Sequence, residues 1–560
     1  MEINNRFEIW KSLPTVSPED RERLIEMDEA EKADSFYREL QFGTAGLRGK
    51  LGPGTNRMNE QVIARATLGL AKVIESRGEA AKHRGVAIAW DIRHRSEMFM
   101  RVAADVLASR GIRVHIFSGI RPTPMLSFAV RALHTQAGIV ITASHNPKEY
   151  NGYKVYWEEG SQIRDAIADE ISGEIEKLDY DVTVDKTFEE YQADGLILTI
   201  PKNVEDRYYD LTLSKAIEDD IDKEIDIVYT PLNGTGNLPV RRVLKERGFH
   251  KVHLVEEQTN PDPNFTTVGY PNPEDVHAFE YAMKLGEAVD ANILIATDPD
   301  CDRVAIVVRN EHGGFVPLNG NQTGALLLEY ILSRRSEKGD LPKNAAVVKS
   351  IVTGELGTRI CEKYGVPMFN TLTGFKNICA LANEWDHTGE YTFLFGYEES
   401  IGYVYGDHVR DKDAVVTTMM IVEMAAYYAR RGKTLGEVLE DLYREHHFHG
   451  EHLMSVVKEG QAGQEQIANI MKDLRTRPIE CIGDIAVEGV VDYRDGIEKI
   501  GASDVLEYHM ADGSRFYVRP SGTEPKIKLY IYTTDADAQA AREKIDWIRS
   551  AITDRFDGKQ

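Results

Sequence analysis

The residue with the clearest chemical potential is Ser144, which lies in the segment Thr-Ala-Ser-His-Asn-Pro at 142–147. This segment directly follows the apolar run 137–141, which has the composition of a short buried strand. A serine at the end of a strand in an α/β sheet is well placed to act as a nucleophile or to carry a phosphoryl group. The alternative is that its hydroxyl only caps a helix or closes a turn.

Three aspartates, Asp298, Asp300 and Asp302, follow a second apolar run at 291–296. If their segment is extended, alternate residues point to the same side and the three carboxylates converge. Carboxylates crowded in this way need a cation, and such hard oxygen ligands suit Mg²⁺, with Ca²⁺ and Mn²⁺ as alternatives. A solvated acidic turn is the competing interpretation.

The acidic pattern also resembles the start of an EF-hand calcium loop, which requires glycine at its sixth position and glutamate at its twelfth. Counted from Asp298, these positions hold Arg303 and Arg309, so the EF-hand interpretation fails. A magnesium site together with a reactive serine indicates phosphoryl transfer.

A third segment, Arg-Pro-Ser-Gly-Thr-Glu-Pro-Lys at 519–526, lies between two strand-like runs. It combines a guanidinium, two hydroxyls and a glycine that lets backbone amides approach an anion, which are the groups that bind phosphate. A hairpin connection without function is the alternative. The chain contains neither GxxxxGK[ST] nor a GxGxxG after a strand, so nucleotide-driven kinase chemistry has no support.

A fourth segment, Gly-Tyr-Glu-Glu-Ser-Ile-Gly-Tyr at 396–403, follows an aromatic run and precedes Arg-Asp-Lys-Asp at 410–413. Its adjacent carboxylates and its serine could accept hydrogen bonds from sugar hydroxyls. Upstream, the segment 371–376 contains a lysine that could bind a phosphate or a hydroxyl. Solvated loops are the alternative interpretation of both segments.

Together these motifs resemble those of the α-D-phosphohexomutase superfamily, and within it the longer phosphoglucomutases and phosphopentomutases. The resemblance extends from the segment 42–49 to Tyr530 and includes all four family motifs in order. It implies an intramolecular phosphotransferase, an isomerase that uses Mg²⁺ and a phosphoserine.

The resemblance also implies roles for individual residues. Ser144 matches the serine that the family carries in phosphorylated form, and one of its phosphate oxygens would join the metal ligands Asp298, Asp300 and Asp302. The loop that grips the phosphate not being transferred is matched by Arg519, Ser521, Gly522 and Thr523. Further substrate-binding candidates are Arg303, Thr373, Gly374, Lys376, Glu398 and Ser400.

Lys154 is the candidate general acid and base, with Arg48 as the second candidate and His145 as a further catalytic residue beside the serine. Some relatives have a histidine just after the sugar loop, where this chain has Gly402, so Lys154 would have more to do here. A lysine beside a phosphoserine could also act only as a counter-charge.

The chain repeats one order of elements, namely a strand, a loop and helix, a second strand, and a third strand that ends in a loop with chemistry. The repeats lead to the loops at 142–147, at 298–303 and at 396–403. We therefore expect three similar α/β domains with mixed sheets plus a smaller C-terminal α+β domain around a central cleft. The expected boundaries are 1–205, 206–318, 319–449 and 450–560.

The net charge of -24 argues against nucleic acid and anionic membranes as partners. A phosphosugar would then need a locally basic cleft, for which the chain offers Arg48, Lys154, Arg303, Lys376 and Arg519. The 4 cysteines form no CxxC pair and the N-terminus has no apolar signal core, which predict a cytoplasmic protein. The cluster His446, His447, His449 and His452 lacks a metal-binding framework and is interpreted as a surface linker.

The resemblance implies interconversion of α-D-glucose 1-phosphate and glucose 6-phosphate, with glucose 1,6-bisphosphate as intermediate and activator. Alternatives are a phosphopentomutase acting on ribose or deoxyribose phosphate, a phosphomannomutase, and a phosphatase that hydrolyses the phosphoserine. A non-catalytic protein that binds sugar phosphates for regulation would be expected to lack the serine or an aspartate, whereas this chain keeps them all. The preferred sugar and the oligomeric state are left open.

Overall fold

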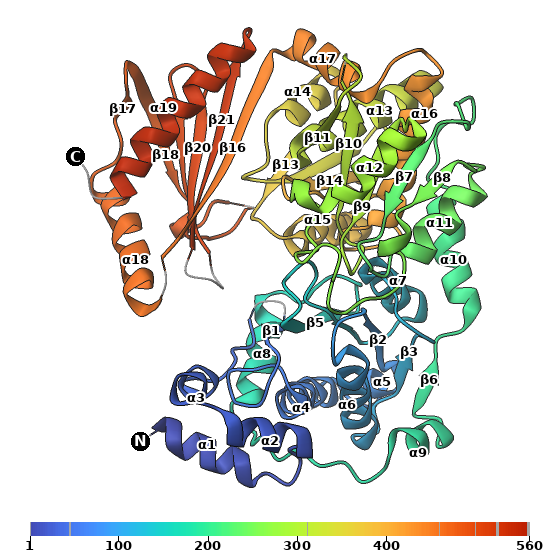
Figure 1. The fold of residues 1–560 in the computed structure, drawn as a ribbon, viewed down its shortest axis with the longest axis vertical. Coiled ribbons are helices and arrows are strands. Elements are labelled where there is room, and N and C mark those ends of the chain that lie inside the picture. The colour runs from blue at the N-terminus through green and yellow to red at the C-terminus, as the bar shows by residue number, and fades with distance from the viewer. Residues whose placement is uncertain are drawn as a thin grey trace.

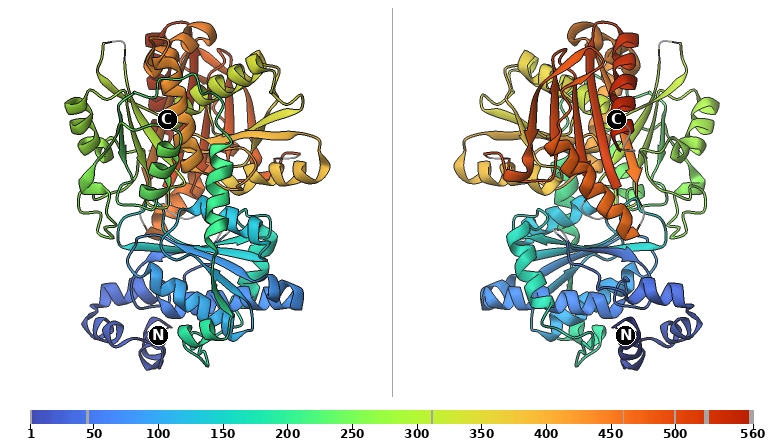
Figure 2. Two further views of the ribbon diagram at one scale, coloured as in Figure 1. Left: turned by 90° about the vertical axis from the view of Figure 1, so that its right-hand side faces the viewer. Right: turned by 90° about the vertical axis from the view of Figure 1, so that its left-hand side faces the viewer.

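The computed structural model describes residues 2–43, 46–310, 312–458, 460–498, 500–521 and 526–556. Within them, four β-sheets follow one another along the chain, and we call the units built on them domains I to IV. Figure 1 shows domain I at the bottom, domains II and III above it, and domain IV at the upper left. In both views of Figure 2, domain I forms the base on which the other domains stand.

Three helices precede the first sheet: α1 (Glu2–Ser12), α2 (Pro18–Glu26) and α3 (Glu29–Phe36). They pack through apolar side chains, and the ring centroids of Trp10 and Phe36 lie 6.1 Å apart. An ion pair between Arg95 Nη2 and Asp20 Oδ1, at 2.9 Å, fastens α2 to the start of a helix in domain I. The three helices therefore form part of domain I.

Domain I contains a six-stranded mixed sheet in the order β1-β5-β4-β2-β3-β6. Its strands are β1 (Gly46–Lys50), β2 (Val86–Trp90), β3 (Val114–Ile116), β4 (Ala137–Ile141), β5 (Tyr150–Trp157) and β6 (Ile197–Thr199). The helices are α4 (Glu60–Ser76), α5 (Glu79–Arg84), α6 (Ser96–Ser109), α7 (Thr123–Leu133), α8 (Asp165–Ile175), α9 (Phe188–Ala193) and α10 (Lys202–Leu213). Every residue of β2 and β4 is buried, as expected of central strands that are covered on both faces.

Domain II has a five-stranded sheet in the order β11-β10-β9-β7-β8. Its elements are β7 (Ile227–Thr230), α11 (Asn237–Glu246), β8 (Val252–Leu254), η1 (Glu256–Gln258), η2 (Val276–Phe279), α12 (Glu280–Val289), β9 (Ile293–Thr297), β10 (Val304–Arg309) and β11 (Phe315–Leu318).

Domain III has a four-stranded sheet in the order β13-β12-β14-β15. Its elements are α13 (Gly320–Lys338), β12 (Ala345–Ser350), α14 (Leu356–Lys363), β13 (Met368–Thr371), α15 (Phe375–Thr388), β14 (Thr392–Glu398), β15 (Gly402–Tyr405), α16 (Ala414–Ala429) and α17 (Leu435–His446). Capping boxes begin α13 at Asn319 and α17 at Thr434, so both helix starts are encoded locally.

The first three sheets share one arrangement of four strands, which confirms the predicted repeat. The neighbours are β3-β2-β4-β5 in domain I, β8-β7-β9-β10 in domain II and β13-β12-β14-β15 in domain III. In each set the first two pairings are parallel and the third is antiparallel. Equivalent loops of the three domains therefore leave their sheets at equivalent places.

Domain IV is an antiparallel sheet in the order β16-β21-β20-β19-β18-β17, packed against two helices. Its elements are β16 (Phe448–Val457), α18 (Gly460–Thr476), β17 (Cys481–Ile482), β18 (Ile485–Asp492), η3 (Tyr493–Asp495), β19 (Leu506–Met510), β20 (Arg515–Pro520), β21 (Lys526–Asp535) and α19 (Ala538–Phe556). Its core, which includes Phe516, Leu529 and Ile548, is separate from the large core of the other domains. The predicted smaller α+β domain is confirmed.

The junction of domains III and IV contains the histidine cluster. His446 ends α17 and His449 lies at the start of β16, so the segment does link two domains. His449 is buried, however, and burial lowers its pKa to about 4, so the expectation of a surface segment is wrong at this residue. None of the helices in the described ranges combines the length and apolar character needed to span a membrane.

The predicted domain boundaries stay proposals. The limit at 205/206 falls inside α10, which leads from the sheet of domain I towards domain II, and the limit at 449/450 falls just after the start of β16.

A buried carboxylate in α16 connects domains II and III. The side chain of Glu423 accepts hydrogen bonds from the backbone N–H groups of Ile217 and Glu218, at 2.8 and 3.0 Å, and from Tyr330 Oη at 2.9 Å. It also accepts one from Arg247 Nη2, at the residue that directly follows α11, at 2.9 Å. The cluster replaces the water that the carboxylate would lose on burial, which is the condition for a stable buried charge.

We predict that Glu423→Ala lowers the free energy of unfolding by about 3 kcal/mol, because the substitution leaves the Arg247 guanidinium without its buried partner. Urea denaturation measures the change. The matched control is Glu224→Ala, since Glu224 is 75% exposed and lies 3.7 Å from Lys251 Nζ. An exposed pair of that kind contributes about 0.5 kcal/mol or less. Equal effects of the two substitutions would contradict the prediction.

Candidate active site

Equivalent loops of the three α/β domains supply the site. The loop after β4 contains Ser144, and the loop after β9 contains Asp298, Asp300 and Asp302. Strand β14 ends at Glu398, and the loop after it contains Ser400. In each loop one residue that is not glycine has a left-handed backbone conformation, with φ of 52° at Ser144, 51° at Cys301 and 54° at Ile401. Such φ values are uncommon for residues with a side chain and mark places where a tight turn is imposed by its surroundings.

The Ser144 hydroxyl points at the aspartates of domain II. Ser144 Oγ donates a hydrogen bond to Asp298 Oδ2 at 2.7 Å and lies 3.2 Å from His145 Nδ1. The backbone N–H of Ser144 donates to Thr142 Oγ1 at 2.8 Å. Burial and the charge of Arg303 lower the pKa of His145 well below its ordinary value, so its ring is neutral near pH 7.

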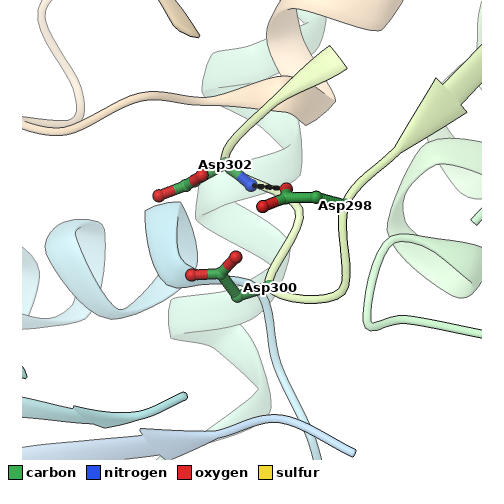
Figure 3. A group of neighbouring side chains, drawn as sticks. All are labelled: Asp298, Asp300 and Asp302. Carbon is green, nitrogen blue, oxygen red and sulfur yellow. Dashed lines mark hydrogen bonds between the residues drawn. The ribbon is translucent and has the colours of Figure 1, made fainter. Parts of the chain in front are cut away.

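The three aspartates converge on a small volume, as Figure 3 shows. One oxygen from each of Asp298, Asp300 and Asp302 lies within 4.8 Å of the others. They do not converge through strand alternation, because residues 299–301 form a turn and Asp298 Oδ1 accepts the backbone N–H groups of Asp302 and Arg303 at 3.1 and 2.9 Å. The prediction of convergence holds, but the extended geometry given for it is wrong.

Two lysines from different domains face the aspartates. Lys154 on β5 lies 2.9 Å from Asp300 Oδ2 and 3.8 Å from Asp302 Oδ2, measured from its Nζ. Lys412 Nζ, from the segment between β15 and α16, lies 2.9 Å from Asp302 Oδ2 and 3.2 Å from Asp411 Oδ1. The segment 410–413 stands out in the sequence, but no role for Lys412 is predicted from it. The signal in the sequence was a lysine between Asp411 and Asp413, the second of which is the N-cap of α16.

The aspartate cluster fits a hard divalent cation. Asp300 Oδ1 and Asp302 Oδ1 are buried and have no hydrogen-bond partner. Burial and the charges of Asp300 and Asp302 raise the pKa of Asp298 well above its ordinary value. At Asp300 burial acts in the same direction, but the charges of Lys154 and Lys412 and the hydrogen bonds with Lys154 and Asp298 together outweigh it and lower the pKa. Within the described part of the chain, no other group of three His, Cys, Asp or Glu side chains lies close enough to share an ion. The protein thus has a site for a metal cofactor built from carboxylate oxygens.

Cys301 lies within the metal-site turn but belongs to the core. A Cβ added at Gly236 would lie 2.8 Å from Cys301 Sγ, which places the thiol against the start of α11. Burial raises the pKa of the thiol well above its ordinary value, so it remains protonated.

The sugar-loop residues of domain III are held from two sides. The backbone N–H of Gly374 donates to Glu398 Oε1 at 2.6 Å, which joins the two segments expected to bind substrate. Arg303 Nη1 of domain II donates to the Ser400 carbonyl at 3.1 Å. Thr373 contributes its carbonyl to Asn377 Nδ2 at 2.9 Å. The loop is therefore fixed to both domains II and III.

Lys376 and Arg48 both contact residues of domain I. Lys376 Nζ lies 2.7 Å from Asp165 Oδ1, at the first residue of α8. Arg48 on β1 donates from Nη1 to Asn146 Oδ1 at 3.2 Å, two positions beyond Ser144 in the chain. Arg48 is thus placed beside the segment 142–150 that carries Ser144, which we call the serine loop, whereas Lys376 contacts the start of α8.

The space beside Gly402 explains the absence of a histidine there. A Cβ added at Gly402 would lie 2.4 Å from Lys412 Cδ. The stem of Lys412 passes over this position, so a larger residue would displace the lysine from Asp302. Glycine at 402 and lysine at 412 are therefore a matched pair.

The predicted phosphate loop of domain IV is only partly described. Arg519 is on β20, opposite Lys528 on β21, and the backbone N–H of Ser521 donates to the Lys526 carbonyl at 2.8 Å. Gly522 and Thr523 lie outside the described residues.

Known families match nearly the whole chain. Residues 39–181, 206–313 and 319–446 match the families described as phosphoglucomutase/phosphomannomutase alpha/beta/alpha domains I, II and III. Residues 455–546 match the C-terminal domain of the same group. The phosphoglucomutase of Staphylococcus haemolyticus is 38% identical over 507 residues, which cover 89% of this chain and 90% of that relative.

Solved structures show the same fold. A phosphoglucomutase/phosphomannomutase family protein from Burkholderia thailandensis has a TM-score of 0.68 at 20% identity and covers 93% of this chain and 98% of its own. The N-acetylphosphoglucosamine mutase of Aspergillus fumigatus, solved with GlcNAc-6P and magnesium, has a TM-score of 0.54 at 13% identity over 97% of this chain and 100% of its own. The four domain matches and the extent of the bacterial relative show that this chain belongs to the phosphoglucomutase/phosphomannomutase family of isomerases.

Proposed function

We propose that the enzyme interconverts α-D-glucose 1-phosphate and glucose 6-phosphate through a phosphoserine at Ser144. The observation that carries this proposal is the 2.7 Å contact between Ser144 Oγ and Asp298 Oδ2, which joins the phosphoryl carrier of one domain to the metal site of another. The 38% identity with a phosphoglucomutase supports the choice of glucose.

In the proposed cycle, the phosphoryl group leaves Ser144 for the free hydroxyl of a sugar monophosphate, whose proton is removed as the new P–O bond forms. The product is glucose 1,6-bisphosphate. The bisphosphate then reorients in the site. Its other phosphoryl group is transferred to Ser144 Oγ, the bond from that phosphorus to the sugar oxygen breaks, and the isomeric glucose monophosphate leaves. Both half-reactions use one serine and one base, so each group must serve in both directions.

The cofactor we propose is Mg²⁺, held by Asp298, Asp300 and Asp302 together with an oxygen of the phosphorylated serine. When bound, it would neutralise negative charge on the transferring group. Lys154 and Lys412 already balance part of the carboxylate charge. Of the two, Lys154 is the group we propose to transfer the proton.

The remaining candidates bind the substrate in this proposal. Glu398 and Ser400 would recognise sugar hydroxyls, while Arg303, Thr373, Gly374 and Lys376 line the same site. Arg48 and His145 flank the transferring group, and the distal phosphate would be held by Arg519, Ser521, Gly522 and Thr523. Free cysteines at all 4 positions suit a reducing cytoplasm, where we place the enzyme.

Phosphorus NMR tests the proposal directly. With Mg²⁺ and a trace of glucose 1,6-bisphosphate, we expect glucose 1-phosphate to be converted faster than mannose 1-phosphate, ribose 1-phosphate or deoxyribose 1-phosphate. Ser144→Ala should abolish conversion, because no other residue is proposed to carry the phosphoryl group. Faster conversion of a pentose 1-phosphate or of mannose 1-phosphate would show that this sugar phosphate, and not glucose 1-phosphate, is the preferred substrate. Conversion by Ser144→Ala at the wild-type rate would refute the phosphoserine mechanism.

The metal site gives a second prediction. Asp300→Asn should weaken Mg²⁺ binding, measured by isothermal titration calorimetry, by at least about 10-fold, because it removes one of three charged ligands. The control is Asp290→Asn in the same domain, an exposed residue with φ of 52°, a conformation that asparagine tolerates. Equal Mg²⁺ affinity of the two variants would contradict the site.

The role of Lys154 gives a third prediction. Lys154→Ala should reduce kcat by about 100-fold or more if the amine transfers the proton, while mass spectrometry still detects phosphate on Ser144. The control is Lys148→Ala, because Lys148 is exposed and lies in the loop between Ser144 and β5. This variant should retain the wild-type kcat. Near-normal turnover of Lys154→Ala would leave the lysine only a counter-charge role.

A further inference from the structure

A buried arginine binds four carbonyl groups of the serine loop. Arg93 Nη2 donates to the carbonyls of Ser144, at 2.5 Å, and of Asn146. Arg93 Nη1 donates to the carbonyls of Pro147 and Tyr150 at 2.9 and 3.1 Å. One guanidinium group therefore organises the backbone from the serine to the first residue of β5.

These bonds depend on the shape of the guanidinium group. Its planar fork presents several N–H donors in fixed directions, whereas a lysine ammonium has only three donors around a single point. The loop also needs such a partner, because its buried carbonyls do not all find one within a regular strand. The left-handed φ of 52° at Ser144 is thus held from outside the loop by Arg93, which binds its carbonyl, and from within the loop by Thr142, which accepts its N–H.

Domain II closes the other side of this arginine. Arg93 is 3% exposed, and its guanidinium carbon lies 5.1 Å from the centre of the Phe265 ring. Next to this contact, His94 Nε2 lies 3.0 Å from Asn264 Oδ1. On the domain I side, Arg93 Nε lies 3.5 Å from Asp91 Oδ2. The segment of domain II that contains Phe265 therefore keeps water away from the bonds that shape the serine loop.

We propose that Arg93 is a positioning residue for phosphoryl transfer, which holds Ser144 Oγ against Asp298 through the loop carbonyls, and that Phe265 of domain II shields these bonds. The inference rests on the proposed function, because it assigns Ser144 the phosphoryl group. It adds a residue that touches neither substrate nor metal but sets the geometry between them.

The affected step is the loading of Ser144. A bond forms between Ser144 Oγ and a phosphorus of glucose 1,6-bisphosphate, the bond from that phosphorus to the sugar oxygen breaks, and the serine proton ends on the sugar oxygen. Attack along this line requires the hydroxyl at the right place, and misplacement by about 1 Å can cost about 100-fold in rate.

The test compares Arg93→Lys with the wild-type enzyme. Quenched-flow mass spectrometry of Ser144 phosphorylation by glucose 1,6-bisphosphate should show loading slowed by about 100-fold, with KM for glucose 1-phosphate unchanged within about twofold. Arg57→Lys is the matched control, since Arg57 is also buried and also binds backbone carbonyls, but these are the carbonyls of Asp34 and Asn56 and not those of the serine loop. It should load at the wild-type rate. Wild-type loading by folded Arg93→Lys would overturn the proposal.

A second variant decides the case in which Arg93→Lys does not fold. Phe265→Leu keeps an apolar side chain but removes the ring from the guanidinium, and we expect loading to slow by about 10-fold while KM stays the same. Loading of Phe265→Leu at the wild-type rate would then overturn the proposal. Failure of the proposed function has a different signature, namely no phosphate on Ser144 in the wild-type enzyme.

Discussion

Three carboxylates crowd together where domains I, II and III meet. Asp298, Asp300 and Asp302 are buried, so the energetic cost of keeping them charged is high unless cations lie close by. Domain I supplies Lys154 and domain III supplies Lys412, each within 2.9 Å of an aspartate oxygen. The electrostatic requirement of one short turn thus brings three domains to the same point.

The repeat explains why the chemistry could be found in the sequence. Strands covered on both faces are continuous apolar runs, and the loops that follow β4, β9 and β14 carry polar residues that stand out against them. The convergence of the aspartates was therefore predictable, but its geometry was not. A left-handed Cys301 has no sequence signal, because such a conformation is imposed by the packing of the thiol against α11 and not by local preference.

The residues that sequence reasoning missed act through folding. Arg93 belongs to the loop after β2, and its carbonyl partners follow β4, so only the parallel pairing of these strands brings them together. Lys412 reaches Asp302 because Gly402 leaves space for its stem. Neither relation is visible in spacing along the chain. The burial of His449 was not predicted for a similar reason. A polar segment between domains is expected to be exposed unless the packing of the two domains around it is known.

The distribution of thiols has a practical consequence. Cys301, Cys361 and Cys379 are buried in the large core, and burial raises the pKa of all three, whereas Cys481 is exposed on β17 of domain IV. A maleimide dye should therefore react at one place in the native protein without any engineering. A dye there would be attached to domain IV, whose sheet and helices share a core of their own. The sequence thus already carries an attachment point for a fluorophore on this domain.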